Sequence, residues 1–231
     1  YRRSEERAFW DHAFCYGSGI ATFAQGMVLG AFIQGFKVDG RTFAGSSFDF
    51  LTPFSIFTGF ALVFGYALLG AGWLIIKTDG ELQAWARRQA RWCFLGVLIA
   101  VGIVSLWTPI MEDEIARRWF SWPNIAWLSP VPILTLVIAW WEWRSLNNNS
   151  EASPFAAAIL LFVMSYLGIA ISLWPMIVPY RFTLWDAASA YSTQAFLLVG
   201  TLVLLPVILM YTGWSYWVFR GKVRADIGYH H

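Results

Sequence analysis

Six long apolar runs dominate the sequence, and each is long enough to cross a lipid bilayer as a helix. A segment in lipid must satisfy its own backbone hydrogen bonds, and a continuous apolar run of about 20 residues does so as an α-helix. We therefore predict an all-α fold, a polytopic transmembrane helix bundle forming a single domain over residues 1–231. The spans are expected at about 13–36, 51–76, 92–110, 123–143, 155–178 and 194–219.

The composition points to the same class of protein. Hydrophobic residues make up 58% of the chain and charged residues only 13%, whereas soluble domains carry about 25% charged residues. The mean hydropathy is +0.54, and the 15 tryptophans are of a type that concentrates at membrane–water interfaces. The basic residues are dispersed over the loops, so the net charge of +2 indicates no nucleic-acid partner.

Loops on the two sides of the predicted bundle differ in charge. Eleven of the 16 basic residues fall on one side and five on the other. Because cytoplasmic loops carry an excess of Lys and Arg, we predict that this side, with both ends of the chain, faces the cytoplasm. The eleven are Arg2, Arg3, Arg7, Lys77, Arg87, Arg88, Arg91, Arg144, Arg220, Lys222 and Arg224.

The stretch WLIIKTDGELQAWARRQARW, residues 73–92, changes from apolar to basic in its middle. Thr78 and Glu81 have the spacing of a capping box, which would start a new helix. Such a basic, tryptophan-bearing segment suits the plane of the membrane interface, so we predict a cytoplasmic interfacial helix at 78–91. Its expected interfacial anchors are Lys77, Trp85, Arg87, Arg88 and Arg91.

Acidic residues avoid the middle of every predicted span. All 14 lie in loops or within about a turn of a span end, with Asp11 before the first span and Glu142 at the end of the fourth. An embedded charge is costly and marks ion pathways, so its absence disfavours an ion-coupled carrier or a proton pump. Asp11 and His12 are candidates for proton uptake from the cytoplasm, because an acid beside an imidazole can relay protons. The alternative is an ordinary solvated pair at the interface.

No residue pattern predicts a bound metal or haem. Cys15 and Cys93 form no CxxC motif and are interpreted as small apolar side chains. Of the histidines, His12 lies at the edge of the first span, and His230 and His231 lie at the C-terminus, so none pairs with another ligand inside a span. We therefore predict no catalytic residue, no metal ligand and no haem ligand in this chain.

Small residues form stripes on the first two spans. Gly19, Gly26 and Gly30 share one stripe of the first span, and Gly65 belongs to a similar stripe on the second. Such stripes let helix backbones approach closely in lipid. We interpret them as packing positions within the chain, with contact to another subunit as the alternative.

Strings from about Gly17 to Val223 resemble subunit II of the cytochrome bd quinol oxidases. The most specific are KTDGELQ within LTPFSIFTGFALVFGYALLGAGWLIIKTDGELQ and YWVFRGKV within LLVGTLVLLPVILMYTGWSYWVFRGKV. GSGIATFAQGMVLGAFIQG, ISLWPMIVP and TLWDAASA follow the same order along the chain. SLWTP, RWFSWPN and SPVP are similar to the cyanide-insensitive branch of the family.

The resemblance implies a haem-free subunit of a bacterial inner-membrane respiratory enzyme. In this family a homologous subunit I holds two b-type haems and one d-type haem, oxidises quinol, and reduces dioxygen to water with cytoplasmic protons. Subunit II has nine spans, stabilises its partner, and is a candidate to line proton or oxygen routes. The resemblance also implies a small single-span subunit and a bound quinone or phospholipid as candidate partners.

The sequence departs from the family at its beginning. The N-terminal third of the family, with its DGFDLG and WDGNETW strings, has no counterpart here, so the six spans are expected to be the last six of nine. Those strings hold the acids suspected of proton delivery, and that role is not transferred. Trp10–Asp11 and Trp185–Asp186 are different pairs.

Two other readings stay open. A six-helix transporter or channel subunit would show a polar site at mid-membrane, with interrupted helices in related halves, and neither feature is visible. A pure assembly partner would have no chemical part in the complex at all. Substitutions at Asp11, His12, Lys77 and Asp186 separate assembly from chemistry, because an assembly partner would keep its turnover in every variant.

Overall fold

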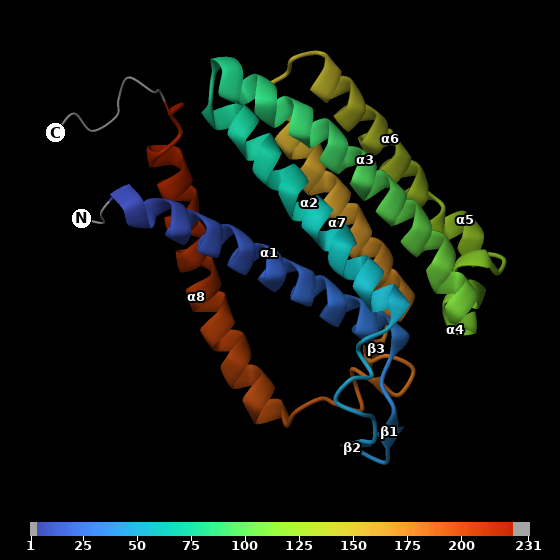
Figure 1. Ribbon diagram of the computed structural model, residues 1–231. Helices are drawn as coiled ribbons and strands as arrows, with labels where there is room; N and C mark the ends of the chain where they lie inside the picture. Colours follow the sequence, from blue (N-terminus) through green and yellow to red (C-terminus); the bar gives the residue numbers. More distant parts are fainter. Residues whose placement is uncertain (1–3, 224–231) are drawn as a thin grey trace.

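Six long apolar helices carry the fold, as the sequence predicts. The computed structural model describes residues 4–223. Within this range, six helical segments are long and apolar enough to cross a membrane, so the protein is an all-α, multi-pass bundle (Figure 1). They are α1 (Ser4–Gln34), α2 (Pro53–Lys77), α3 (Gly80–Met111), α6 (Pro130–Asn147) together with the short α5 (Asn124–Leu128), α7 (Ser153–Leu173) and α8 (Tyr191–Val218).

Helix α2 lies at the centre and contacts α1, α3 and α7, while α6 covers α7 and α3. In Figure 1, α2, α3, α6 and α7 run side by side, whereas α1 and α8 diverge from them. The largest apolar cluster joins α2, α3, α6 and α7. Its most buried members are Leu68, Ile75, Ala86, Ala90, Phe94, Leu146, Ala158 and Leu161.

Helix α2 begins with a complete capping box that the sequence analysis did not identify. The Thr52 hydroxyl accepts a hydrogen bond from the Ser55 amide at 3.0 Å, and the Ser55 hydroxyl accepts one from the Thr52 amide at 3.0 Å. Pro53 occupies the first helical position, where its missing N–H is not needed. This cap fixes the start of the second span.

The turn from α2 to α3 differs from the prediction. The Thr78 hydroxyl donates to the Leu74 carbonyl at 2.7 Å instead of capping a new helix, and Asp79, the N-cap residue, makes no side-chain cap bond. From Gly80 the helix continues without a break to Met111. The predicted separate helix at 78–91 is therefore the first part of the third span. Its Ala, Leu, Gln and Arg residues are strong helix formers, so nothing stops the helix at the membrane boundary.

The opposite end of the bundle carries the small elements. Two antiparallel pairs, β1 (Val38–Asp39) with β2 (Thr42–Phe43) and β3 (Met176–Val178) with β4 (Phe182–Thr183), lie there. The short helix α4 (Asp113–Phe120) follows α3 at this end.

Helix α7 ends at Leu173, short of the predicted limit at 178. Pro175 explains the difference, because the residue before a proline is disfavoured in helical conformation. The chain after it folds back on the bundle, and the Tyr180 hydroxyl donates to the Ile33 carbonyl at 2.9 Å. Burial raises the pKa of Tyr180, which keeps this hydroxyl protonated as a donor.

Helix α8 has no buried residue, although its sequence is strongly apolar. Its contact with the bundle is at its C-terminal end, where the Tyr216 and Trp73 rings lie 5.6 Å apart. The side chains along the rest of α8 are exposed. Its apolar surface therefore faces lipid or another protein chain when the molecule is in a membrane.

Candidate functional site at the basic end of the bundle

Four segments meet at the end of the bundle that holds most of the basic side chains. Lys77, at the end of α2, donates through Nζ to the Phe219 carbonyl and to the Gly221 carbonyl at 3.2 Å. The Val223 amide in turn donates to the Lys77 carbonyl at 2.8 Å. These bonds tie the chain after α8 to the α2–α3 turn. The sequence alone did not predict this connection.

Lys222 adds two ion pairs to the same connection. Its Nζ lies 2.7 Å from Asp79 Oδ1 and 2.7 Å from Glu151 Oε1, so it bridges the α2–α3 turn and the α6–α7 loop. The hydrogen bond from Lys222 lowers the pKa of Glu151, and the bond to Asp79 is the main cause that raises the pKa of Lys222. We name Lys77, Asp79, Glu151 and Lys222 the C-terminal clamp.

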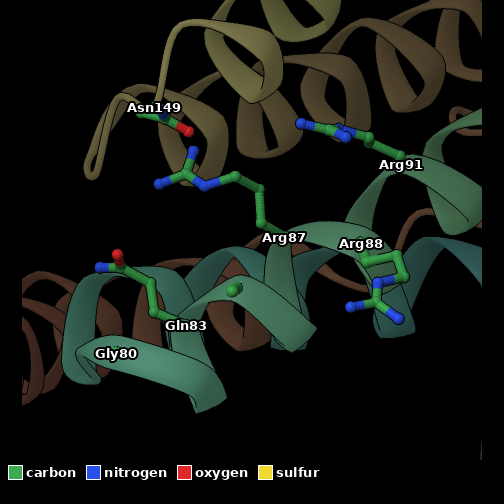
Figure 2. A pocket seen from close by; sticks show the side chains of 7 residues that line it. Gly80, Gln83, Arg87, Arg88, Arg91 and Asn149 are labelled. Carbon is green, nitrogen blue, oxygen red and sulfur yellow. The ribbon is translucent and has the colours of Figure 1, made fainter.

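A cavity of about 580 Å³ opens beside the clamp, on the first turns of α3 (Figure 2). The residues that line it are Gly80, Gln83, Ala84, Arg87, Arg88, Arg91 and Asn149. Three arginines and no acidic residue line this space, so it is suited to an anionic group.

The arginines of the cavity play different parts. Arg87 is only 6% exposed and donates through Nη1 to the Ser150 carbonyl at 2.9 Å. Arg91 donates through Nη2 to the Leu146 carbonyl at 3.3 Å. Figure 2 shows Arg87 extending toward Asn149, whereas Arg88 turns away from it.

Of the predicted interfacial anchors, Arg87 differs most from expectation. It is buried, because its guanidinium group donates a hydrogen bond to the Ser150 carbonyl in the α6–α7 loop and does not extend toward a lipid surface. Trp85 is 49% exposed and Arg88 is exposed. Lys77 is half-buried in the clamp, with its ammonium group 5.0 Å from the centre of the Trp73 ring. Anchoring at a lipid surface stays a prediction for these residues.

Glu142 lies near the end of the fourth span, as predicted, but its environment differs from that of a residue at a membrane boundary. Helix α6 continues to Asn147, and the Glu142 side chain is fully buried. Neither of its carboxylate oxygens has a hydrogen-bond partner among the described residues. Its neighbours on the same face, Ala139 and Leu146, are buried too. This i, i+3, i+7 spacing was the available signal that Glu142 belongs to the packed face.

Asp11 and His12 lie on the exposed first part of α1. The His12 ring nitrogen Nδ1 is bonded to the Ala8 carbonyl at 2.5 Å, and the His12 and Tyr16 rings lie 6.2 Å apart. Adjacent residues on a helix do not face each other, and no hydrogen bond or ion pair joins these two side chains. Their role in proton uptake stays a prediction.

The glycine stripe packs mainly against helices of the same chain. A Cβ atom added at Gly26 would lie 2.7 Å from the Gly59 Cα, and one added at Gly30 would lie 2.6 Å from the Ser55 Cα. At Gly65 it would meet the Phe162 ring at 2.6 Å, whereas at Gly19 it would meet nothing within 4 Å. Thus α1 and α2 approach closely at two of the four positions.

Potential metal ligands are not clustered within residues 4–223. His12, the one histidine in residues 4–223, is exposed, and no group of three His, Cys, Asp or Glu residues in that range could hold a metal ion. Neither the arginine cavity nor the groove next to it is lined by a histidine, cysteine or methionine. His230 and His231 lie outside the described residues, as do Arg2, Arg3 and Arg224.

The fold and its basic end define a multi-pass α-helical membrane protein. The family model of cytochrome bd terminal oxidase subunit II matches residues 1–219, and the chain belongs to this family. The recognised resemblance is therefore confirmed.

Curated relatives agree with the family. The chain is 25% identical to cytochrome bd-I ubiquinol oxidase subunit 2 of Escherichia coli strain K12, over 95% of this chain and 67% of that protein. It is 24% identical to the probable cytochrome oxidase subunit 2 of Haemophilus influenzae, with the same coverage. It is 23% identical to cytochrome bd ubiquinol oxidase subunit 2 of Bacillus subtilis, over 93% of this chain and 64% of that protein. The chain thus spans about two thirds of the length of these relatives.

Proposed function

We propose that this chain is the haem-free second subunit of a bd-type quinol oxidase in a bacterial inner membrane. The family match across residues 1–219 carries the proposal, and the six apolar helices support it. The relatives are named as subunits of ubiquinol oxidases, which are oxidoreductase complexes. The same match disfavours the transporter alternative.

In this proposal the redox chemistry belongs to a partner. The family membership supports assigning two b-type haems and one d-type haem to a first subunit that this chain stabilises. The exposed α8 offers an apolar surface, and the clamp fixes one end of that helix. A small single-span subunit and a bound quinone are further proposed components.

We also propose that the clamp end of the bundle faces the cytoplasm. The basic residues Lys77, Arg88 and Lys222 gather there, which is the side that the positive-inside rule assigns to the cytoplasm. Asp11 and His12 then lie near the cytoplasmic boundary, where a proton route to the partner would begin.

Affinity purification tests the assembly. A tag on this chain, expressed at its native level, should isolate a larger haem-bearing polypeptide in equal amounts, together with quinol oxidase activity. Deleting the chain should remove both the activity and the d-type haem signal from membranes. Full oxidase activity in the deletion strain would contradict the proposed role.

A further inference from the structure

Two hollows on α3 and α6 share a wall and differ in chemistry. The arginine cavity is polar, and a second hollow of about 270 Å³ adjoins it. That second hollow, which we name the tryptophan groove, is lined by Arg88, Arg91, Trp92, Leu95 and Trp143. Arg88 and Arg91 line both, so a polar hollow and an apolar one lie next to each other.

The order of residues along α3 produces this arrangement. Arg88, Arg91, Trp92 and Leu95 follow the i, i+3, i+4, i+7 spacing of one helix face. The face is therefore basic toward the clamp end and apolar toward the middle of the membrane. Trp143 of α6 forms the opposite wall, and its ring stacks on Phe94 with 6.4 Å between centres.

The two shared arginines keep unused hydrogen-bond donors. Arg91 gives Nη2 to the Leu146 carbonyl, but its buried Nε has no partner among the described residues. Arg88 is exposed, and its guanidinium group makes no hydrogen bond or ion pair with the described residues. No acidic side chain lines either hollow, so nothing in them neutralises these charges.

We propose that this pair of hollows binds an anionic glycerophospholipid of the membrane leaflet at the clamp end. The phosphate diester lies against Arg88 and Arg91, where guanidinium groups can donate paired hydrogen bonds to its oxygens. An acyl chain lies along Trp92, Leu95 and Trp143. Basic pockets between transmembrane helices on the cytoplasmic side are typical binding sites for anionic headgroups.

The combination of charge and shape selects this ligand. A quinone head is neutral and leaves the arginine charges unpaired. Free inorganic phosphate can pair with the arginines, but it has no apolar part to occupy the tryptophan groove. Only an amphipathic anion matches both halves. The inference depends on the chain lying in a membrane and not on its place in an oxidase.

Native mass spectrometry of the intact complex tests the site. The complex is purified, stripped of loose lipid, and titrated with phosphatidylglycerol or phosphatidylethanolamine in nanodiscs. We expect retained phosphatidylglycerol, and about tenfold weaker binding in Arg88→Gln, as loss of one charge-assisted contact implies. Arg88→Lys keeps the charge and should recover part of the binding.

Matched variants separate this site from general lipid contact. Arg117→Gln removes an exposed arginine of α4, at the opposite end of the bundle, and should leave binding unchanged. Trp92→Ala should weaken the binding of long-chain lipid while sparing a short-chain phosphatidylglycerol. Each variant is first checked for the unfolding temperature of the parent complex.

Three outcomes would overturn the proposal. One is equal phosphatidylglycerol binding in Arg88→Gln and in the parent. Another is equal retention of the zwitterionic and the anionic lipid. The third is full displacement of the lipid by millimolar inorganic phosphate, which would identify a free-anion site in place of a lipid site.

Discussion

The burial of Glu142 is the feature of a single residue that the sequence indicates least. Its carboxyl group lies inside the helix bundle, with no hydrogen-bond partner among the described residues. Helix α7, which packs on α6, has no charged residue, and no described cation lies within 4.0 Å of Glu142. Burying such a group without a partner destabilises a fold by several kcal/mol when the group is charged.

Replacing Glu142 by an apolar residue should therefore stabilise the protein. We expect Glu142→Met to increase the free energy of unfolding by about 1–3 kcal/mol, because it removes an unsatisfied buried polar group. Thermal unfolding of the purified complex measures the change. The control Glu81→Met lies at an exposed position of α3 and should change stability by about 0.5 kcal/mol or less. A loss of stability in Glu142→Met would show that the carboxyl group has a partner in the complex.

The C-terminal clamp makes a prediction about pH. The folded-state pKa of Glu151 lies below its ordinary value of 4.5, so its contribution is present above that value and is lost as the pH falls through the lowered pKa. The folded-state pKa of Lys222 lies above 10.5, so its contribution is complete below that value and is lost as the pH rises through the raised pKa. The clamp should be closed between about pH 5 and pH 10.

Hydrogen exchange at the Val223 amide measures the state of the clamp, because this amide donates to the Lys77 carbonyl. The difference in protection between the parent and Lys222→Gln should be constant at neutral pH and should shrink as the pH falls through the lowered pKa of Glu151. These groups are at the surface, so the effect is local and shrinks with added salt. Equal protection in parent and variant at pH 7 would contradict the clamp.

At the scale of elements, the close approach of α1 to α2 depends on glycine. Gly30 faces the backbone of Ser55, and the Thr58 hydroxyl donates to the Gly26 carbonyl at 2.9 Å. We expect Gly30→Ala to destabilise the complex by about 1–3 kcal/mol through overpacking. Gly19→Ala is the control, because its new methyl group meets nothing within 4 Å and alanine is the better helix former.

The unfolding temperatures of the two variants decide between packing inside the chain and contact with another subunit. A fall for Gly30→Ala alone supports packing of α1 on α2. An equal fall for Gly19→Ala would show that another subunit covers the outer part of the stripe.

The sequence predicts where the helices lie along the chain better than it predicts which side of each helix is buried. Apolar run length alone identifies all six spans, because lipid imposes length and composition on each helix separately. The end of α7 also has a local signal in the sequence, because Pro175 disfavours a helical conformation at Trp174. The burial of Arg87 depends on a loop 63 residues away, which no local pattern reports.

The candidate site was predictable only in part. The sequence shows the arginines as a basic stretch. It does not show that Asn149 of the α6–α7 loop completes the lining of the cavity, or that Trp143 of α6 completes the lining of the groove. The clamp joins Lys77 to residues 142 and 144 positions further along the chain. Contacts between distant segments arise from the packing of whole helices, so they become visible only in the folded chain.

Taken as a whole, the chain belongs to the subunit II family and spans about two thirds of the length of its relatives. We propose that a partner subunit supplies the haems and that this chain is its membrane scaffold. In that proposal, the helix bundle, the clamped α8 and the hollows on α3 and α6 hold and orient the neighbouring subunit.

Reduced-minus-oxidised absorption spectra of the separated subunits test the proposal that this chain carries no haem. We expect b-type and d-type haem signals from the complex and none from this chain purified alone. A stoichiometric haem signal from this chain alone, or quinol oxidation without a partner, would contradict it.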